Sequence, residues 1–186
     1  KLLASVLSKI SIKRFQQVYD DDFFEFSTKR NIILDGLFKN KSFEELSLCC
    51  CVDKSGIGQT EVSAMIERCL KNNTRLKTLS FIEPRFIPET LISIAEGLIT
   101  NSTLTELYFE NIFDYNERSR DYGNIEYGQY FKHFFQALQL NTGLRKMNFK
   151  LFYFKNNQDI EWCFINARRA ADIAEMFVKN STLEYV

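Results

Sequence analysis

The cysteines and the histidine are the first residues of this sequence to consider for metal binding or catalysis. Cys49, Cys50 and Cys51 are consecutive, but neighbouring strand residues point to opposite faces, so these thiols alone cannot form a tetrahedral zinc site. His133 is the single histidine, and no motif supplies the nucleophile and the orienting acid that it would need as a general base. We therefore expect no metal, no cofactor and no enzymatic activity.

Two further groups give weaker chemical signals. The three aspartates at 20–22 could attract a cation, although charge runs usually form a solvated loop or the start of a helix. The Gly-Ile-Gly segment at 56–58 is too short for a phosphate-binding loop and lacks the flanking strand and helix. Neither group predicts a catalytic or ligand-binding site.

A repeated phrase indicates the elements that would position any functional residue. Each copy has an apolar residue, an asparagine three positions later, and an apolar triplet that begins three positions after the asparagine. The asparagines are Asn40, Asn73, Asn101, Asn141 and Asn180, and the triplets begin at Phe43, Leu76, Leu104, Leu144 and Leu183. Successive triplets start 33, 28, 40 and 39 residues apart. Such self-similarity predicts stacked structural units instead of one globular core.

The predicted domain spans residues 1–186 and contains about six units, of which the first and the last are partial. Leu7, Ile10 and Ile12 fit the same triplet 36 residues before Phe43, which places the first strand at these residues. The chain starts with lysine and stops inside the last unit. We interpret it as a fragment of a longer protein.

Each unit is expected to contain one strand and one helix. The last two triplet residues, such as Leu46 and Leu48, alternate with an exposed residue, which is the period of a strand. The segments before the asparagines have the period of a helix, and Pro88 suits the first turn of one of them. Four apolar stripes result: Leu91, Ile94, Ala95 and Leu98; Val62, Met65, Ile66, Cys69 and Leu70; Phe131, Phe134, Phe135 and Leu138; and Ala170, Ile173, Ala174 and Phe177.

The repeated asparagine has two interpretations. Asparagine tolerates the left-handed backbone conformation that closes a helix, so its repetition would end each helix and turn the chain into the strand. Asn40, Asn101 and Asn180 also begin Asn-x-Ser/Thr sequons, which accept a glycan only in a secreted protein. We prefer the helix-ending interpretation, because it also accounts for Asn73 and Asn141, which begin no sequon.

Alternating strands and helices in units of this length resemble the leucine-rich repeat, in the long-unit subclass of ribonuclease inhibitor. The resemblance covers nearly the whole chain. This chain departs from the family pattern by carrying Phe81, Phe109 and Phe149 in place of leucine, and it lacks the usual asparagine ladder after the triplet. The resemblance implies an α/β leucine-rich repeat solenoid, with a curved parallel β-sheet on the concave side and α-helices on the convex side.

A narrower resemblance lies in the second half of the chain. The phrases Asn-Ser-Thr-Leu-Thr-Glu-Leu from Asn101 and Asn-Thr-Gly-Leu-Arg-Lys-Met-Asn-Phe from Asn141, together with residues 167–176, are similar to the C-terminal repeat domain of tropomodulin. That family caps the pointed ends of actin filaments, so the resemblance implies actin as a partner. The chain departs from that domain at Asn180, where it begins another strand instead of a terminal helix.

Alternate strand residues would form columns on the concave face. The second half presents aromatic and amide groups among charges, a mixture typical of binding surfaces. The predicted partner-binding patch comprises Glu106, Tyr108, Glu110, Lys146, Asn148 and Lys150. In the first unit the same columns would hold Lys9, Ser11 and Lys13.

Two units exceed the 28-residue unit by 12 and 11 residues, and the excess falls within 111–127 and 150–168. Insertions in repeat proteins form loops and often carry function. From these insertions we include Tyr115, Arg118, Arg120, Tyr122, Tyr153 and Trp162 in the partner-binding prediction. The alternative is that the insertions are irregular loops packed by their own aromatic residues.

Composition narrows the class of partner. The chain has 24 basic and 24 acidic residues, which gives no electrostatic reason to expect nucleic acid or an anionic membrane as a partner. Five cysteines without a spaced framework indicate reduced thiols in a cytosolic or nuclear setting, and of these we predict the cytoplasm. No apolar run approaches the length of a transmembrane helix.

The predicted function is therefore non-enzymatic protein–protein interaction, in which a leucine-rich repeat scaffold binds another protein through its concave face and inserted loops. The first alternative is a tropomodulin-like, actin-binding domain that caps pointed ends. The others are a GTPase-activating repeat protein and the ligand-sensing repeat region of an innate immune receptor.

Overall fold

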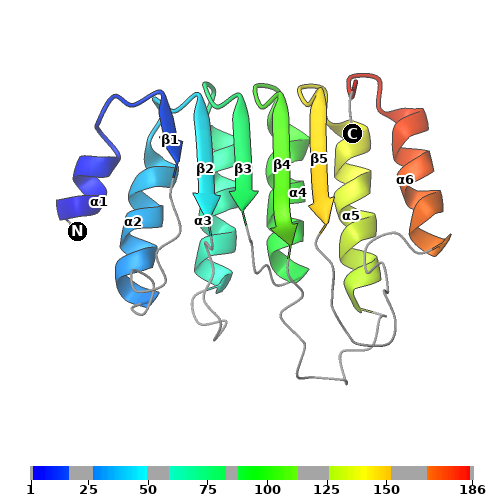
Figure 1. The fold of residues 1–186 in the computed structure, drawn as a ribbon, viewed down its shortest axis with the longest axis horizontal. Helices are drawn as coiled ribbons and strands as arrows, with labels where there is room; N and C mark the ends of the chain where they lie inside the picture. The colour runs from blue at the N-terminus through cyan, green and yellow to red at the C-terminus, as the bar shows by residue number, and fades with distance from the viewer. Residues whose placement is uncertain are drawn as a thin grey trace.

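The computed structural model describes residues 2–16, 27–49, 59–82, 88–112, 126–151 and 167–184. Helices and strands alternate in the order α1 (Leu2–Leu7), β1 (Arg14–Gln16), α2 (Ser27–Lys39), β2 (Glu45–Cys49), α3 (Gln59–Asn72), β3 (Thr78–Ile82), α4 (Pro88–Thr100), β4 (Glu106–Ile112), α5 (Glu126–Leu140), β5 (Lys146–Leu151) and α6 (Ala167–Lys179). The strands form one parallel sheet in the order β1-β2-β3-β4-β5. Figure 1 shows helices α2 to α5 in a layer behind this sheet. The predicted α/β repeat fold is confirmed.

The core lies between the sheet and the helices. Strand β3 alternates buried and half-buried residues along its length, as the strand period predicts. Phe81 and Phe109, which replace leucine, fill this layer: their ring centroids lie 5.7 Å apart, and Phe134 of α5 meets Phe109 edge-on at 6.0 Å. Burying each ring contributes about 2 kcal/mol, so aromatic packing couples neighbouring units.

The side chains of the five repeated asparagines connect successive units by hydrogen bonds, which the sequence did not reveal. We call this set of asparagines the ladder; it lies before the triplet, not after it as in the leucine-rich repeat family. Each lies directly after a helix and is at most 9% exposed. The amide of Asn141 donates to the carbonyls of Leu98 and Asn101 in the preceding unit, at 2.6 and 2.7 Å. Its side-chain oxygen accepts from the backbone N–H groups of Gly143 and Leu144, at 3.0 and 2.7 Å. One side chain thus satisfies four buried polar groups and fixes the start of the next strand.

The ladder decides between the two interpretations of the asparagines. Helices end directly before all five, so the helix-ending prediction is confirmed. The sequon residues Asn40, Asn101 and Asn180 are 1%, 6% and 9% exposed, and their amide nitrogens donate to backbone carbonyls. A glycan on any of them would require the ladder to open, so glycosylation of the folded unit is excluded at these three sites.

The predicted strand of the first unit is wrong in register. Phe15, not Ile10, pairs with Leu46, and β1 begins at Arg14. Ile10 instead occupies the position of the ladder asparagine, because its carbonyl and that of Leu7 accept from Asn40. The first unit is also one residue shorter between this position and the strand. Arg14 and Gln16 therefore replace Lys9 and Ser11 in the columns.

The predicted helix stripes agree with the structure in α3, α4 and α5, whose apolar residues are buried or nearly so. In α6 the prediction holds for Ile173, which packs against the core, but is wrong for two residues: Ala174 is exposed and Phe177 is 43% exposed, whereas Met176 is fully buried. Phe177 lies three positions before its asparagine, where Leu70 of α3 is covered by α4. No described helix covers that side of α6, so the same position is open there.

Candidate protein-binding site

The sheet face opposite the helices, here called the open face, brings most of the predicted patch together. Glu106 pairs with Thr78 on one side and Lys146 on the other, and Tyr108 lies between Ser80 and Asn148. Neighbouring strands of a sheet lie about 4.8 Å apart, so these side chains form continuous rows. The rows through β3, β4 and β5 have the predicted register.

Tyr108 is held by charged neighbours on both sides. Its hydroxyl donates a 2.8 Å hydrogen bond to Oε2 of Glu106, which also accepts a longer bond from Thr78 at 3.5 Å. The ammonium of Lys146 lies 5.4 Å from the centroid of the Tyr108 ring, within reach of a cation–π interaction. The ring is therefore fixed in place, with an acid at its hydroxyl and a cation over its face.

The environment of Tyr108 further favours the protonated form of its phenol. Partial burial is the largest cause that raises its pKa, and the hydrogen bond and negative charge of Glu106 raise it further against the lowering effect of Lys146. A phenol whose pKa lies above its ordinary value of about 10 remains a neutral hydrogen-bond donor at physiological pH. Tyr108 can therefore offer both an apolar ring and a polar group to a partner, as interface tyrosines do.

Exposure differs across the patch. Glu106, Tyr108 and Glu110 are half-buried, while Lys146 and Asn148 are exposed. For Lys150 the structure describes the backbone, which pairs with Glu110. The predicted contact residues of the insertions lie outside the described residues: Tyr115, Arg118, Arg120, Tyr122, Tyr153 and Trp162.

The first half of the open face has a different character. Its rows carry the small hydroxyls of Ser47 and Ser80, and Arg14 forms a 2.9 Å ion pair with Glu45 of the next strand. Exposed pairs of this kind contribute little to stability. The aromatic group that distinguishes the second half has no equivalent in the described rows of the first three strands.

The residues considered for catalysis do not gather in the described part of the chain. His133 lies on α5 and its Nε2 is 2.9 Å from the Glu96 carboxylate of α4, on the helix side of the molecule. Cys69 is buried and the loss of solvation raises the pKa of its thiol to about 12, so it is not a nucleophile at neutral pH. Within the described ranges, no three histidine, cysteine or acidic side chains are grouped to hold a metal.

The cysteine run lies almost entirely outside the described residues: only the backbone of Cys49, at the end of β2, is included. The aspartates at 20–22 and the glycines at 56–58 also lie outside them. None of the described helices has the length and apolarity needed to cross a membrane.

Comparison with known proteins gives structural relatives only. No protein-family model matches the sequence, and no curated protein matches it. A solved structure titled "Leiomodin-1 Actin-Binding Site 2 (ABS2)" is 18% identical with a TM-score of 0.57, over 96% of this chain and 84% of the other. The tropomodulin C-terminal domain of Caenorhabditis elegans is 13% identical with a TM-score of 0.60, over 96% and 91%. At these identities the similarity establishes the fold, which is the leucine-rich-repeat-like fold of the tropomodulin C-terminal domain.

Proposed function

We propose that this chain is a non-enzymatic, cytoplasmic protein-recognition domain whose open face binds another protein around Tyr108. The observation that carries the proposal is the arrangement of Tyr108 between Glu106 and Lys146 on adjacent, register-fixed strands. Tyrosine is enriched at the energetic centres of interfaces. Here the side chain is already ordered before binding.

The mechanism is rigid presentation of side chains. The ladder and the sheet fix the backbone of each strand, and the hydrogen bond to Glu106 fixes the Tyr108 ring. Ordering a flexible side chain on binding costs about 1 kcal/mol, and this cost is reduced when the free protein already holds the bound geometry. The partner thus meets a preformed surface with alternating charge.

Actin is the first specific partner to test. One structural relative is named as an actin-binding site, and this chain covers most of that domain. The ribonuclease-inhibitor subclass and the roles as a GTPase-activating protein or an innate immune receptor remain predictions from the sequence. A nucleotide-binding module upstream of the repeats would favour the receptor role, whereas tropomyosin-binding helices upstream would favour actin.

The general proposal is tested by affinity capture from a lysate of the native organism, followed by mass spectrometry. We expect a partner that the wild-type chain retains and that Tyr108→Ala and Lys146→Glu lose. Gln16→Ala, an exposed change on β1 of the same face, is the matched control. If both patch variants keep the partner, the site is not this patch. If no protein is retained above control, recognition itself loses its support.

The actin proposal is tested separately, with purified components. We expect the chain to slow elongation at filament pointed ends and Tyr108→Ala to relieve that inhibition more than Gln16→Ala does. Sedimentation with filaments and gel filtration with actin monomers would detect binding to sides or monomers. An absence of binding in all three assays would remove actin and leave the general proposal standing.

A further inference from the structure

The helices are not equally close to one another, and the residue four positions before each ladder asparagine accounts for the difference. In α4 this residue is Gly97, where a Cβ atom would lie 2.6 Å from the Cβ of Leu70, so α3 and α4 meet closely. In α3 the same position is Cys69. We attribute the looser packing of α2 against α3 to this larger side chain, because the side chains at a helix contact set the distance between the axes. These two helices accordingly contact each other less extensively.

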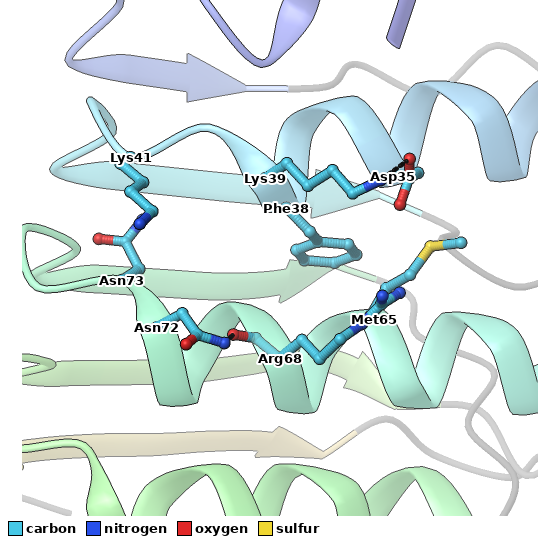
Figure 2. Close-up of a pocket in the computed structure, with 8 residues that line it drawn as sticks. All are labelled: Asp35, Phe38, Lys39, Lys41, Met65, Arg68, Asn72 and Asn73. Carbon is cyan, nitrogen blue, oxygen red and sulfur yellow. Dashed lines mark hydrogen bonds and ion pairs between the residues drawn. The ribbon is translucent and has the colours of Figure 1, made fainter. Parts of the chain in front are cut away.

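Phe38 fills part of this wider gap. It lies two positions before Asn40 and is 6% exposed, whereas Ile99 and Val178 at the same position in α4 and α6 are 37% and 85% exposed. Figure 2 shows its ring between α2 and α3, with Met65 extending from α3. These apolar side chains line a groove of about 230 Å³ between the two helices. The α2–α3 groove is lined by Asp35, Phe38, Lys39, Lys41, Met65, Arg68, Asn72 and Asn73.

The rim of the α2–α3 groove is positively charged in a chain whose net charge is zero. Three cations line it, against the single carboxylate of Asp35, which forms a 2.6 Å ion pair with Lys39. Lys41 and Arg68 are exposed, and neither forms an ion pair with any residue that the structure describes. Two cations are therefore available beside an apolar floor.

We propose that the α2–α3 groove binds an acidic segment of a partner protein, in which one large apolar side chain is flanked by carboxylates. The apolar side chain rests on Phe38 and Met65, and the carboxylates pair with Lys41 and Arg68. The volume favours a side chain over a small molecule, because pockets for drug-sized ligands are roughly 300–1,000 Å³. The groove lies on the helix side, so it can be occupied while the open face holds another partner.

The test uses a peptide with fluorescein on its N-terminus, fluorescein-Asp-Glu-Asp-Phe-Asp-Glu-Asp-amide, and fluorescence anisotropy with the full chain. We expect saturable binding that weakens as the salt concentration rises. Lys41→Gln combined with Arg68→Gln should weaken binding about fivefold, as two exposed ion pairs are lost. The charge-matched control is Lys77→Gln combined with Lys132→Gln, two exposed lysines away from the groove, which should leave binding within twofold of the wild type.

Two further arms examine the apolar floor. Replacing the phenylalanine of the peptide with alanine, or filling the groove with Met65→Trp, should each weaken binding at least fivefold. Thermal melting of every variant confirms that it folds. Equal loss in the groove and control variants, or equal binding of the alanine peptide, would overturn the proposal. So would binding to vesicles containing phosphatidylserine, lost in the groove variant, without binding to the peptide.

Discussion

The asparagine ladder and the open face belong to the same units of the chain, yet one is uniform and the other varied. Every ladder position from Asn40 to Asn180 holds the same residue in the same buried environment. On the open face the corresponding row reads Gln16, Ser47, Ser80, Tyr108 and Asn148. Packing against a neighbour dictates the first set, while solvent-facing strand positions leave the second free to vary. Repetition thus marks structure, and departures from repetition mark candidate function.

The largest effect is expected at the ladder, with Asn141→Ala. The change leaves the N–H groups of Gly143 and Leu144 and the carbonyl of Asn101 without the partner that Asn141 supplies, and the carbonyl of Leu98 keeps only the backbone N–H of Asn101. We expect a loss of about 3 kcal/mol in the free energy of unfolding, measured by urea denaturation.

The matched control for the ladder is Asn72→Ala, one position before Asn73 and exposed, which loses a single bond to the Arg68 carbonyl. Its effect should stay below about 1 kcal/mol. Equal losses in the two variants would show that a ladder asparagine contributes no more to stability than an exposed asparagine does.

A smaller effect is expected for Gly143→Ala, in the turn between Asn141 and β5. A Cβ atom there would lie 2.6 Å from the backbone carbonyl carbon of Ser102, and backbone cannot move aside as a flexible side chain can. We expect a loss of about 2 kcal/mol in stability, measured by denaturation. Thr142→Ala, an exposed change one residue earlier in the same turn, is the comparison. If the glycine variant is as stable as this one, the two units are not closely stacked.

On the open face, Tyr108→Phe should change stability by less than about 1 kcal/mol, because the lost hydrogen bond to Glu106 is partly exposed to water. The same variant should weaken binding to whichever partner affinity capture identifies. A large loss of stability with unchanged affinity would show that Tyr108, like the ladder asparagines, stabilises the fold and does not bind the partner.

The smallest effect concerns Glu44, which lies beside β2 and pairs with Arg75 at 3.2 Å and Lys13 at 3.6 Å. The hydrogen bond from Arg75 and the charge of Lys13 lower its pKa. A lowered pKa contributes stability at neutral pH that is lost as the pH falls through the folded-state pKa, below 4.5. The melting temperature of Glu44→Gln should therefore lie slightly below the wild-type value at pH 7 and coincide with it near pH 3. A difference that persists at pH 3 would point to another cause.

The sequence predicted what depends on residues close together in the chain. Strand period placed Tyr108 on the open face, and helix period identified the buried side of α3, α4 and α5. The ladder was not predicted, because the carbonyls that pair with Asn101 lie 28 and 31 residues earlier and one copy of the pattern does not show them. The first strand was misplaced because Ile10 breaks the asparagine pattern and the unit is one residue shorter.

Two surface features depended on neighbouring helices and so could not be predicted from any single unit. Phe177 of α6 fits the apolar stripe, but its burial requires a helix on its outer side, and none is described there. We attribute the α2–α3 groove to the difference in size between Cys69 and Gly97, which has an effect only where two helices pack together. For the candidate binding site, the rows were predictable, whereas the bond between Tyr108 and Glu106 required side-chain positions.

The direction of the ladder bonds bears on how the chain emerges from the ribosome. In every rung the asparagine amide donates to carbonyls of the unit before it, as Asn101 does to Leu70 and Asn73. Synthesis runs from the N-terminus, so the acceptors are already outside the exit tunnel when each donor appears. A nascent chain can therefore lock one unit after another without waiting for later sequence, which shortens the time that apolar surface is open to aggregation.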